Sequence, residues 1–136
     1  MATAGYSGTP LMKKLGIGPD TKLVLINAPD NYFQLLETDL SDQVAGKDQV
    51  PDLVHLFVEK NKDFESQMKK LQTHLKKNRK LVIWVSWYKK SAGIPTDLTE
   101  DVIRNYALNN GLVDVKVCAV NDKWSGLKLV VPVALR

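Results

Sequence analysis

The chain has 136 residues, of which 44% are hydrophobic and 25% charged, and its net charge is +4. That balance is typical of one soluble, globular domain, and we expect residues 1–136 to form a single domain. No apolar run approaches the roughly 18 residues of a membrane span, and no signal peptide is visible, so we expect a cytoplasmic protein that does not enter a membrane. The single cysteine, Cys118, excludes an internal disulfide.

The positive charge is concentrated in one segment. Residues 60–80 contain eight lysines and arginines against two carboxylates, a net of +6, so the rest of the chain has a net charge of −2. The segment is predicted to be a helix, and its charges are interpreted first as a solvated face. An anionic partner surface is the alternative.

Turn residues divide the chain into segments whose apolar pattern predicts strands or helices. Continuous apolar runs indicate strands covered on both faces, and apolar residues recurring every three or four positions indicate helices. The predicted helices cover 10–16, 31–37, 62–77 and 99–110. The predicted strands cover 21–28, 52–58, 81–87, 112–120 and 127–133. The polar segment 38–51 allows a short edge strand over 43–45.

Capping residues mark several helix ends. Thr9 is placed to cap the first helix. The last helix begins at either of two caps: Asp97, which forms a capping-box pattern with Glu100, or Thr99. Gly111 suits the turn that ends this helix.

The order of elements predicts an α/β fold, a three-layer sandwich with a mostly parallel sheet ending in an antiparallel hairpin. The last two strands are joined by the short polar connection 121–126, which suits antiparallel neighbours. Over residues 52–133 the pattern resembles the closing half of a class I, adenosylmethionine-dependent methyltransferase fold. The start of the chain departs from that fold: residues 27–32 contain no glycine, and residues 29–51 are too few for the missing strands. A cofactor pocket of that kind is therefore expected to be truncated.

Several motifs resemble a short bacterial family of unknown function, the domain-of-unknown-function family numbered 3052. The resemblance covers nearly the whole chain and implies a bacterial origin and a shortened Rossmann-like fold, but no activity. Its motifs are Gly5-Tyr6-Ser7-Gly8-Thr9-Pro10-Leu11, Lys13-Lys14-Leu15-Gly16-Ile17, Asn27-Ala28-Pro29, Pro95-Thr96-Asp97-Leu98-Thr99-Glu100-Asp101-Val102, Val113-Asp114-Val115-Lys116-Val117-Cys118-Ala119-Val120 and Trp124-Ser125-Gly126-Leu127-Lys128.

A ligand site is predicted where the carboxyl ends of the parallel strands meet. Ligands of open α/β sheets bind in the crevice at that edge. Three segments end there, and the stretch from Trp84 to Glu100 forms the strand-to-helix junction. The candidate ligand-binding residues are Asn27, Asp30, Glu59, Trp87, Lys89, Lys90, Ser91, Gly93, Thr96 and Thr99.

Lys89 and Lys90, next to a helix N-terminus, favour a small anionic or nucleotide-like ligand. Acidic residues at the same terminus, Asp97, Glu100 and Asp101, oppose this interpretation because they repel an anion. A well-capped helix after a loop is the simpler interpretation.

No catalytic group of residues is visible in the sequence. His55 lies inside a predicted buried strand and is expected to be a neutral, hydrogen-bonded core residue. The two histidines and one cysteine have no metal-ligand spacing, and no phosphate-binding or nucleophile-elbow motif is present. Whether the protein is an enzyme, and with which cofactor, is left open.

Three hypotheses follow. The first is a non-catalytic module that binds a small ligand or a protein partner at the strand ends. The second is a divergent transferase in which Asn27, Asp30 or Glu59 contacts a Rossmann-type cofactor. A nucleic-acid binder using the basic helix ranks last, because no aromatic residues alternate with the lysines as single-strand binders require. The oligomeric state is not indicated.

Overall fold

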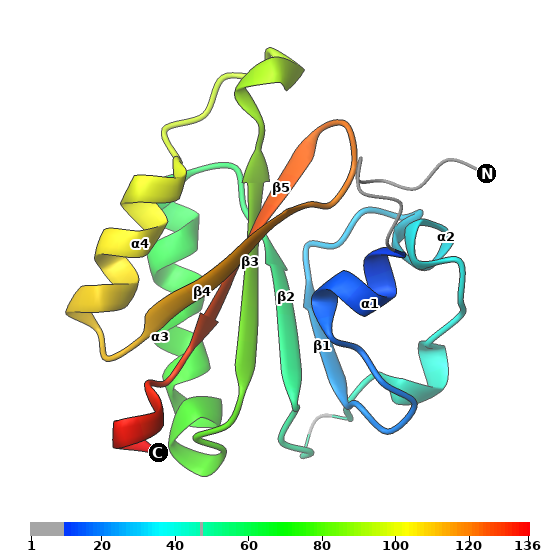
Figure 1. Ribbon diagram of the computed structural model, residues 1–136, viewed down its shortest axis with the longest axis vertical. Helices are drawn as coiled ribbons and strands as arrows, with labels where there is room; N and C mark the ends of the chain where they lie inside the picture. The colour runs from blue at the N-terminus through cyan, green and yellow to red at the C-terminus, as the bar shows by residue number, and fades with distance from the viewer. Residues whose placement is uncertain (1–9, 47) are drawn as a thin grey trace.

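The computed structural model describes residues 10–46 and 48–136 and confirms the α/β class. An open five-stranded sheet has helices on both faces (Figure 1). The strands, in chain order, are β1 (Leu23–Ile26), β2 (Leu53–Phe57), β3 (Val82–Tyr88), β4 (Val113–Ala119) and β5 (Trp124–Val130). Their spatial order is β1-β2-β3-β5-β4. The first three are parallel, and β5 pairs antiparallel with both β3 and β4, as the predicted terminal hairpin requires.

The four α-helices lie where the apolar spacing predicts them, within two residues at each end. They are α1 (Leu11–Leu15), α2 (Tyr32–Leu36), α3 (Asn61–Lys77) and α4 (Glu100–Asn109), with short 3₁₀ turns at Ser41–Gln43, Lys90–Ala92 and Val133–Leu135. Gly16 ends α1 in the left-handed conformation with a φ of 78°. Its predicted cap, Thr9, lies outside the described residues.

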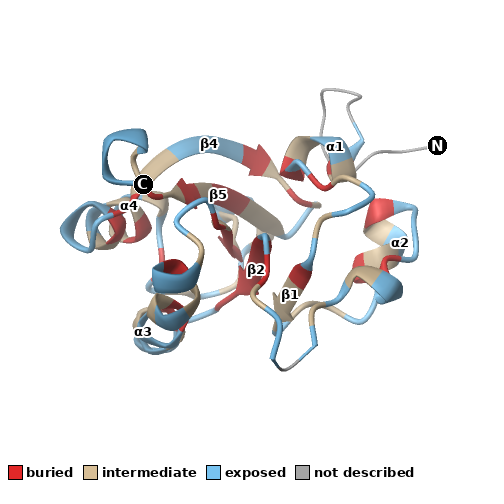
Figure 2. Cartoon of the chain, turned by 90° about the horizontal axis from the view of Figure 1, so that it is seen from below, coloured by how far each residue is buried: buried red, intermediate tan, exposed pale blue. Residues whose placement is uncertain are grey.

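The core is divided into two layers by the sheet. On one face α3 and α4 cover a cluster that includes Val54 and Leu56, and on the other α1 and α2 cover a cluster that includes Leu53 and Phe57. Alternate residues of one strand point to opposite faces, which explains the division. Trp84 belongs to the second cluster and Trp87 to the first, as their spacing predicts. Figure 2 shows buried residues on the strands and on the helix sides that face them.

The connection from β1 to β2 is unusual. Both α2 and α3 belong to connections that step in the same direction across the sheet, yet they cover opposite faces. Two right-handed crossovers in one direction would place them on the same face. The chain instead passes first to the outer edge of β1, where Val44 forms a single parallel bridge with Leu23. The short edge strand allowed over 43–45 is therefore reduced to one bridge.

The hairpin is tighter than its sequence indicates. We predicted the last strand from residue 127, but β5 begins at Trp124. The Asn121 side-chain oxygen accepts hydrogen bonds from the backbone amides of Lys123 and Trp124, at 2.9 and 2.8 Å, which closes the turn early. Trp124 consequently lies on a strand opposite Tyr88 instead of in a turn.

Candidate functional site

The carboxyl ends of β1, β2 and β3 meet at one edge of the sheet because these strands are parallel. Asn27, Glu59 and Lys89 each lie within two residues of the end of one of these strands. Residues at these strand ends line two separate hollows instead of one crevice. The strand order explains this, since the parallel strands follow one another in sequence and leave no topological switch point. A third hollow lies at the start of α3 and is lined by Asn61, Lys62, Glu65, Ser66, Lys69, Lys70 and Asp97.

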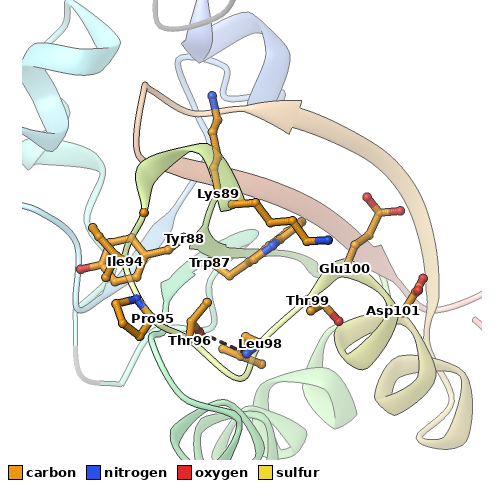
Figure 3. Close-up of a pocket in the computed structure, with 12 residues that line it drawn as sticks. Trp87, Tyr88, Lys89, Ile94, Pro95, Thr96, Leu98, Thr99, Glu100 and Asp101 are labelled. Atoms are coloured by element: carbon orange, nitrogen blue, oxygen red, sulfur yellow. Dashed lines mark hydrogen bonds between the residues drawn. The ribbon is translucent and has the colours of Figure 1, made fainter.

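The larger hollow is a cleft of about 720 Å³ between the end of β3, the loop that follows it and the start of α4 (Figure 3). Six predicted site residues line it: Trp87, Lys89, Lys90, Gly93, Thr96 and Thr99. The other lining residues are Tyr88, Ile94, Pro95, Leu98, Glu100 and Asp101. Ser91, also predicted, is exposed on the same loop and does not line the cleft.

The two ends of this cleft differ in chemistry. Tyr88, Ile94 and Pro95 form an apolar end, whereas the side chains of Glu100 and Asp101 lie at the opposite end, with Trp87 between them (Figure 3). The Trp87 side chain is 93% buried and belongs to the core cluster under α3 and α4. The cleft therefore combines a fixed aromatic floor with a charged rim.

Side-chain hydrogen bonds attach the loop before α4 to the start of α3. The Thr96 hydroxyl donates to the Glu59 carbonyl and accepts from the Leu98 amide at 3.1 Å. Asp97 accepts a hydrogen bond from the Asn61 amide at 2.8 Å. These contacts join the β3–α4 loop to the β2–α3 junction, so two walls of the edge are held as one unit.

Of the two caps proposed for α4, Thr99 is confirmed: its hydroxyl accepts from the Val102 amide at 3.2 Å. The predicted capping box of Asp97 and Glu100 is wrong. Asp97 is used at the first residue of α3 instead, because the folded chain brings that helix start next to it. The hydroxyls of Thr96 and Thr99, two of the candidate ligand-binding residues, are thus both hydrogen-bonded within the chain.

Arg104 compensates part of the negative charge at the acidic end of the cleft. Its guanidinium pairs with Glu100, with Asp101 at 2.9 Å and with Asp114 on β4 at 3.0 Å. Hydrogen bonds to Glu100 and Asp114 raise the pKa of Arg104 above its ordinary value. Two of the three carboxylates that argued against an anionic ligand, Glu100 and Asp101, therefore share a cationic partner, and the third, Asp97, accepts a hydrogen bond from the Asn61 amide.

The smaller hollow, of about 110 Å³, lies at the ends of β1 and β2. It is lined by Asn27, Phe57, Val58, Glu59, Asp63 and Trp124. The Trp124 ring stacks on Tyr88, with ring centroids 4.2 Å apart. Partial burial, the charge of Glu59 and a hydrogen bond to its side chain raise the pKa of Tyr88. This stacked pair stands between the two hollows, with Tyr88 lining the larger and Trp124 the smaller.

The predicted site residues therefore divide into those that line the larger hollow, those that line the smaller one and those that line neither. Asn27, in the left-handed conformation with a φ of 58°, and Glu59 line the smaller hollow. Asp30 is exposed and lines neither hollow.

Three buried polar side chains, Tyr32, His55 and Ser86, form a row of hydrogen bonds on one face of the sheet. The Tyr32 hydroxyl lies 2.7 Å from His55 Nδ1, and His55 Nε2 lies 2.7 Å from the Ser86 hydroxyl. His55 is fully buried, and burial lowers its pKa to about 3, so the ring is neutral. The prediction of a neutral, hydrogen-bonded core histidine is confirmed. The three hydrogen-bonded side chains follow the order of a serine–histidine relay, but all of them are buried away from solvent.

Sequence reasoning missed the apolar end of the cleft. Ile94 and Pro95 are apolar residues inside an otherwise polar loop, and that contrast could have identified them. Arg104 could have been found from its spacing, because Glu100 and Asp101 lie four and three residues before it on one helix.

Two absences apply to the described part of the chain. No group of three histidine, cysteine or acidic side chains there is placed to hold a metal ion. No helix among these residues is long and apolar enough to cross a membrane.

Comparison with known proteins identifies no relative: no protein family matches the sequence, and no curated protein or solved structure is significantly similar. The resemblances to family 3052 and to a shortened methyltransferase fold therefore stay predictions.

Proposed function

We propose that the protein is a non-catalytic binding module that holds a small ligand in the cleft at the end of β3. The cleft itself carries this proposal. Its volume of about 720 Å³ lies within the range of roughly 300–1,000 Å³ of small-molecule sites, and it combines apolar and aromatic walls with a few charged groups. It also lies at the edge formed by the carboxyl ends of the three parallel strands, where open α/β sheets bind ligands, although these strands form no topological switch point.

The lining indicates the class of ligand. Trp87, Tyr88, Ile94 and Pro95 provide apolar contact area for a flat or ring-shaped group. Lys89 and Lys90 provide cationic groups for a phosphate or carboxylate, while the opposing carboxylates are paired with Arg104. A small anionic or nucleotide-like molecule satisfies both requirements.

The test is a thermal-shift screen of the full chain with adenine nucleotides, adenosylmethionine and phosphorylated sugars. A ligand present at 100 times its dissociation constant stabilises the folded state by about 2.7 kcal/mol, which a melting curve detects. We expect at least one phosphorylated compound to raise the melting temperature. Absence of any shift across the screen at millimolar ligand would overturn the proposal.

A pair of matched variants places the ligand in the cleft. The double variant Lys89→Gln with Lys90→Gln should weaken binding about tenfold, the equivalent of ~1.4 kcal/mol. The control, Lys13→Gln with Lys22→Gln, removes the same charge from exposed positions outside the cleft and should bind normally. Equal losses in both variants would indicate a general charge effect and not this site.

A divergent transferase is the alternative, with Asn27 and Glu59 contacting a nucleoside cofactor at the ends of β1 and β2. It has less support, because the hollow there is only about 110 Å³ and Trp124 forms part of its wall. Stabilisation by adenosylmethionine that persists in the Lys89/Lys90 double variant, but is lost in Glu59→Gln, would favour this alternative.

A further inference from the structure

We infer that the exposed face of α3 is a second binding surface, one that contacts the phosphodiester backbone of a nucleic-acid duplex. The surface, called here the α3 basic face, consists of Lys62, Lys69, Lys70, Lys76 and Lys77, continued past the helix by Arg79 and Lys80. It lies on α3, separate from the proposed ligand cleft, whose lining includes no α3 residue.

The opposite side of the helix fixes which residues this face presents. Phe64, Met68, Leu71 and Leu75 are all at least 97% buried against the sheet. Lys69 and Lys70 lie between these positions in sequence, Lys62 precedes them and Lys76 and Lys77 follow them, and all five lysines are exposed. Packing therefore holds the whole row of cations outward along one rigid element.

Beyond the start of α3, where Asp63 and Glu65 lie, the face has no acidic residue of its own to neutralise it. Residues 66–80 contain six lysines and arginines and no acidic residue. Within the described residues, every ion pair involves Arg104, and none involves α3. Helix faces built only for solubility usually mix charges of both signs at a spacing of three or four residues. Here Lys70, Lys76 and Lys77 have no acidic residue three or four positions away, so an anionic partner would supply the missing opposite charge.

The composition of the face favours nucleic acid over a protein. A protein interface needs an apolar core, but none of the exposed large hydrophobic residues of the described chain lies on α3. A membrane is also a poor partner, because the apolar side of α3 is buried in the core and cannot insert.

The same composition points to a duplex and to its backbone. From Lys62 to Lys77 the helix spans about 22 Å, at roughly 1.5 Å per residue, so its cations can follow a row of phosphates. The exposed helix positions offer lysine, serine, threonine and, in the first turn, Asp63, but no aromatic ring for stacking on unpaired bases. Lysine acts as a point charge toward phosphate, so binding should depend on salt and not on base sequence.

The experiment measures binding of the full chain to labelled 20-base-pair DNA and RNA duplexes of one sequence, and to the single strand, between 50 and 200 mM salt. With four to six phosphate contacts, the slope of log K against log salt for DNA should be about −4 to −5. Binding of the protein to the DNA duplex, the RNA duplex or both supports the inference. Comparing the two affinities shows which kind of duplex the protein prefers.

Matched variants test the location. The face variant replaces four lysines by glutamine: Lys69→Gln, Lys70→Gln, Lys76→Gln and Lys77→Gln. The control variant removes the same charge from exposed lysines elsewhere: Lys13→Gln, Lys22→Gln, Lys116→Gln and Lys123→Gln. The face variant should lose at least tenfold in affinity at 100 mM salt and up to about 3.6 units of salt slope, since it removes four lysines and each phosphate contact contributes about 0.9 unit. The control variant should keep its slope.

Three outcomes would overturn the inference. They are no duplex binding at 50 mM salt, equal losses in the face and control variants, and binding to phosphatidylserine vesicles without binding to either duplex. Glutamine has a helix propensity close to that of lysine, and circular dichroism of both variants verifies that α3 is intact.

Discussion

The two faces of the sheet handle polar side chains in opposite ways. On the face covered by α1 and α2, His55, Ser86 and the Trp84 indole are buried, and each has a hydrogen-bond partner within the chain. On the face covered by α3 and α4, no buried polar side chain joins the core, two buried atoms of α3 (Asn61 Oδ1 and His74 Nδ1) have no hydrogen-bond partner among the described residues, and charged groups lie at the rim and on the outside of α3. Polar groups that are buried and satisfied specify one packing arrangement, whereas polar groups at a rim are available for recognition. The first face therefore favours stability, and the second presents the groups on which the proposed binding depends.

The largest expected effect separates the two tryptophans of β3. Trp84→Ala should lower the free energy of unfolding by about 4 kcal/mol, because it removes a fully buried ring and leaves the Leu15 carbonyl without its indole donor. Trp87→Ala should cost less, because water can enter the vacated space from the cleft. Urea unfolding of both variants measures the difference. A larger loss for Trp87→Ala would contradict the contrast between the faces.

The second prediction concerns pH. Burial lowers the pKa of His55 to about 3, from 6.5 when unfolded. Between these values the unfolded chain binds a proton that the folded chain does not, so stability falls as pH falls through this window. From pH 7 to pH 4.5 the loss should be about 2–3 kcal/mol.

Urea unfolding across this pH range measures the loss. His55→Gln removes the titrating group and should flatten the profile between pH 6.5 and 4.5. An unchanged slope in this variant would mean that other groups cause the acid sensitivity.

The third prediction tests how closely the first face is packed. A Cβ at Gly126 would lie 3.2 Å from the Trp84 ring and 3.5 Å from the Ser86 hydroxyl oxygen. Gly126→Ala should therefore cost about 2 kcal/mol by overpacking. Gly18→Ala is the control, since its nearest contact would be an ordinary 3.7 Å to Thr21, and its effect should stay within about 0.5 kcal/mol. Thermal unfolding of the two variants measures both losses of stability. Equal losses would contradict the prediction of close packing at Gly126.

The smallest effect tests the caps on the second face. Thr99→Ala should cost about 1 kcal/mol, because it removes the cap of α4. Asp97→Ala should cost about 1 kcal/mol at the start of α3. Because the two side chains serve different helices, their costs should add within about 0.5 kcal/mol in a double-mutant cycle measured by urea unfolding. Strong coupling between the two substitutions would instead indicate that Asp97 and Thr99 act together in capping α4.

Local patterns were enough to predict most of the fold. The stripe of Phe64, Met68, Leu71 and Leu75 predicts α3 and its buried side, and the apolar run from Leu53 to Val58 predicts a strand covered on both faces. Both depend on residues close together in the chain, where periodicity reflects geometry directly.

What the sequence did not reveal depends on partners far apart in the chain. Asp97 serves Asn61, 36 residues away, and His55 joins side chains from α2 and β3. The β1–β2 connection also escaped prediction, because its course depends on one bridge between Val44 and Leu23. The apolar end of the cleft is likewise formed only when the loop folds back beside the end of β3.

The side-chain bonds of Thr96 and Asp97 have a consequence for local opening. They tie the wall of the cleft to the β2–α3 junction, so the wall cannot separate without releasing the Asn61 amide and the Glu59 carbonyl. In hydrogen exchange, the Asn61 amide therefore reports on the cleft although it does not line it. A molecule that holds the cleft closed should slow exchange at the first turn of α3, and through it couple the state of the cleft to the start of the basic helix.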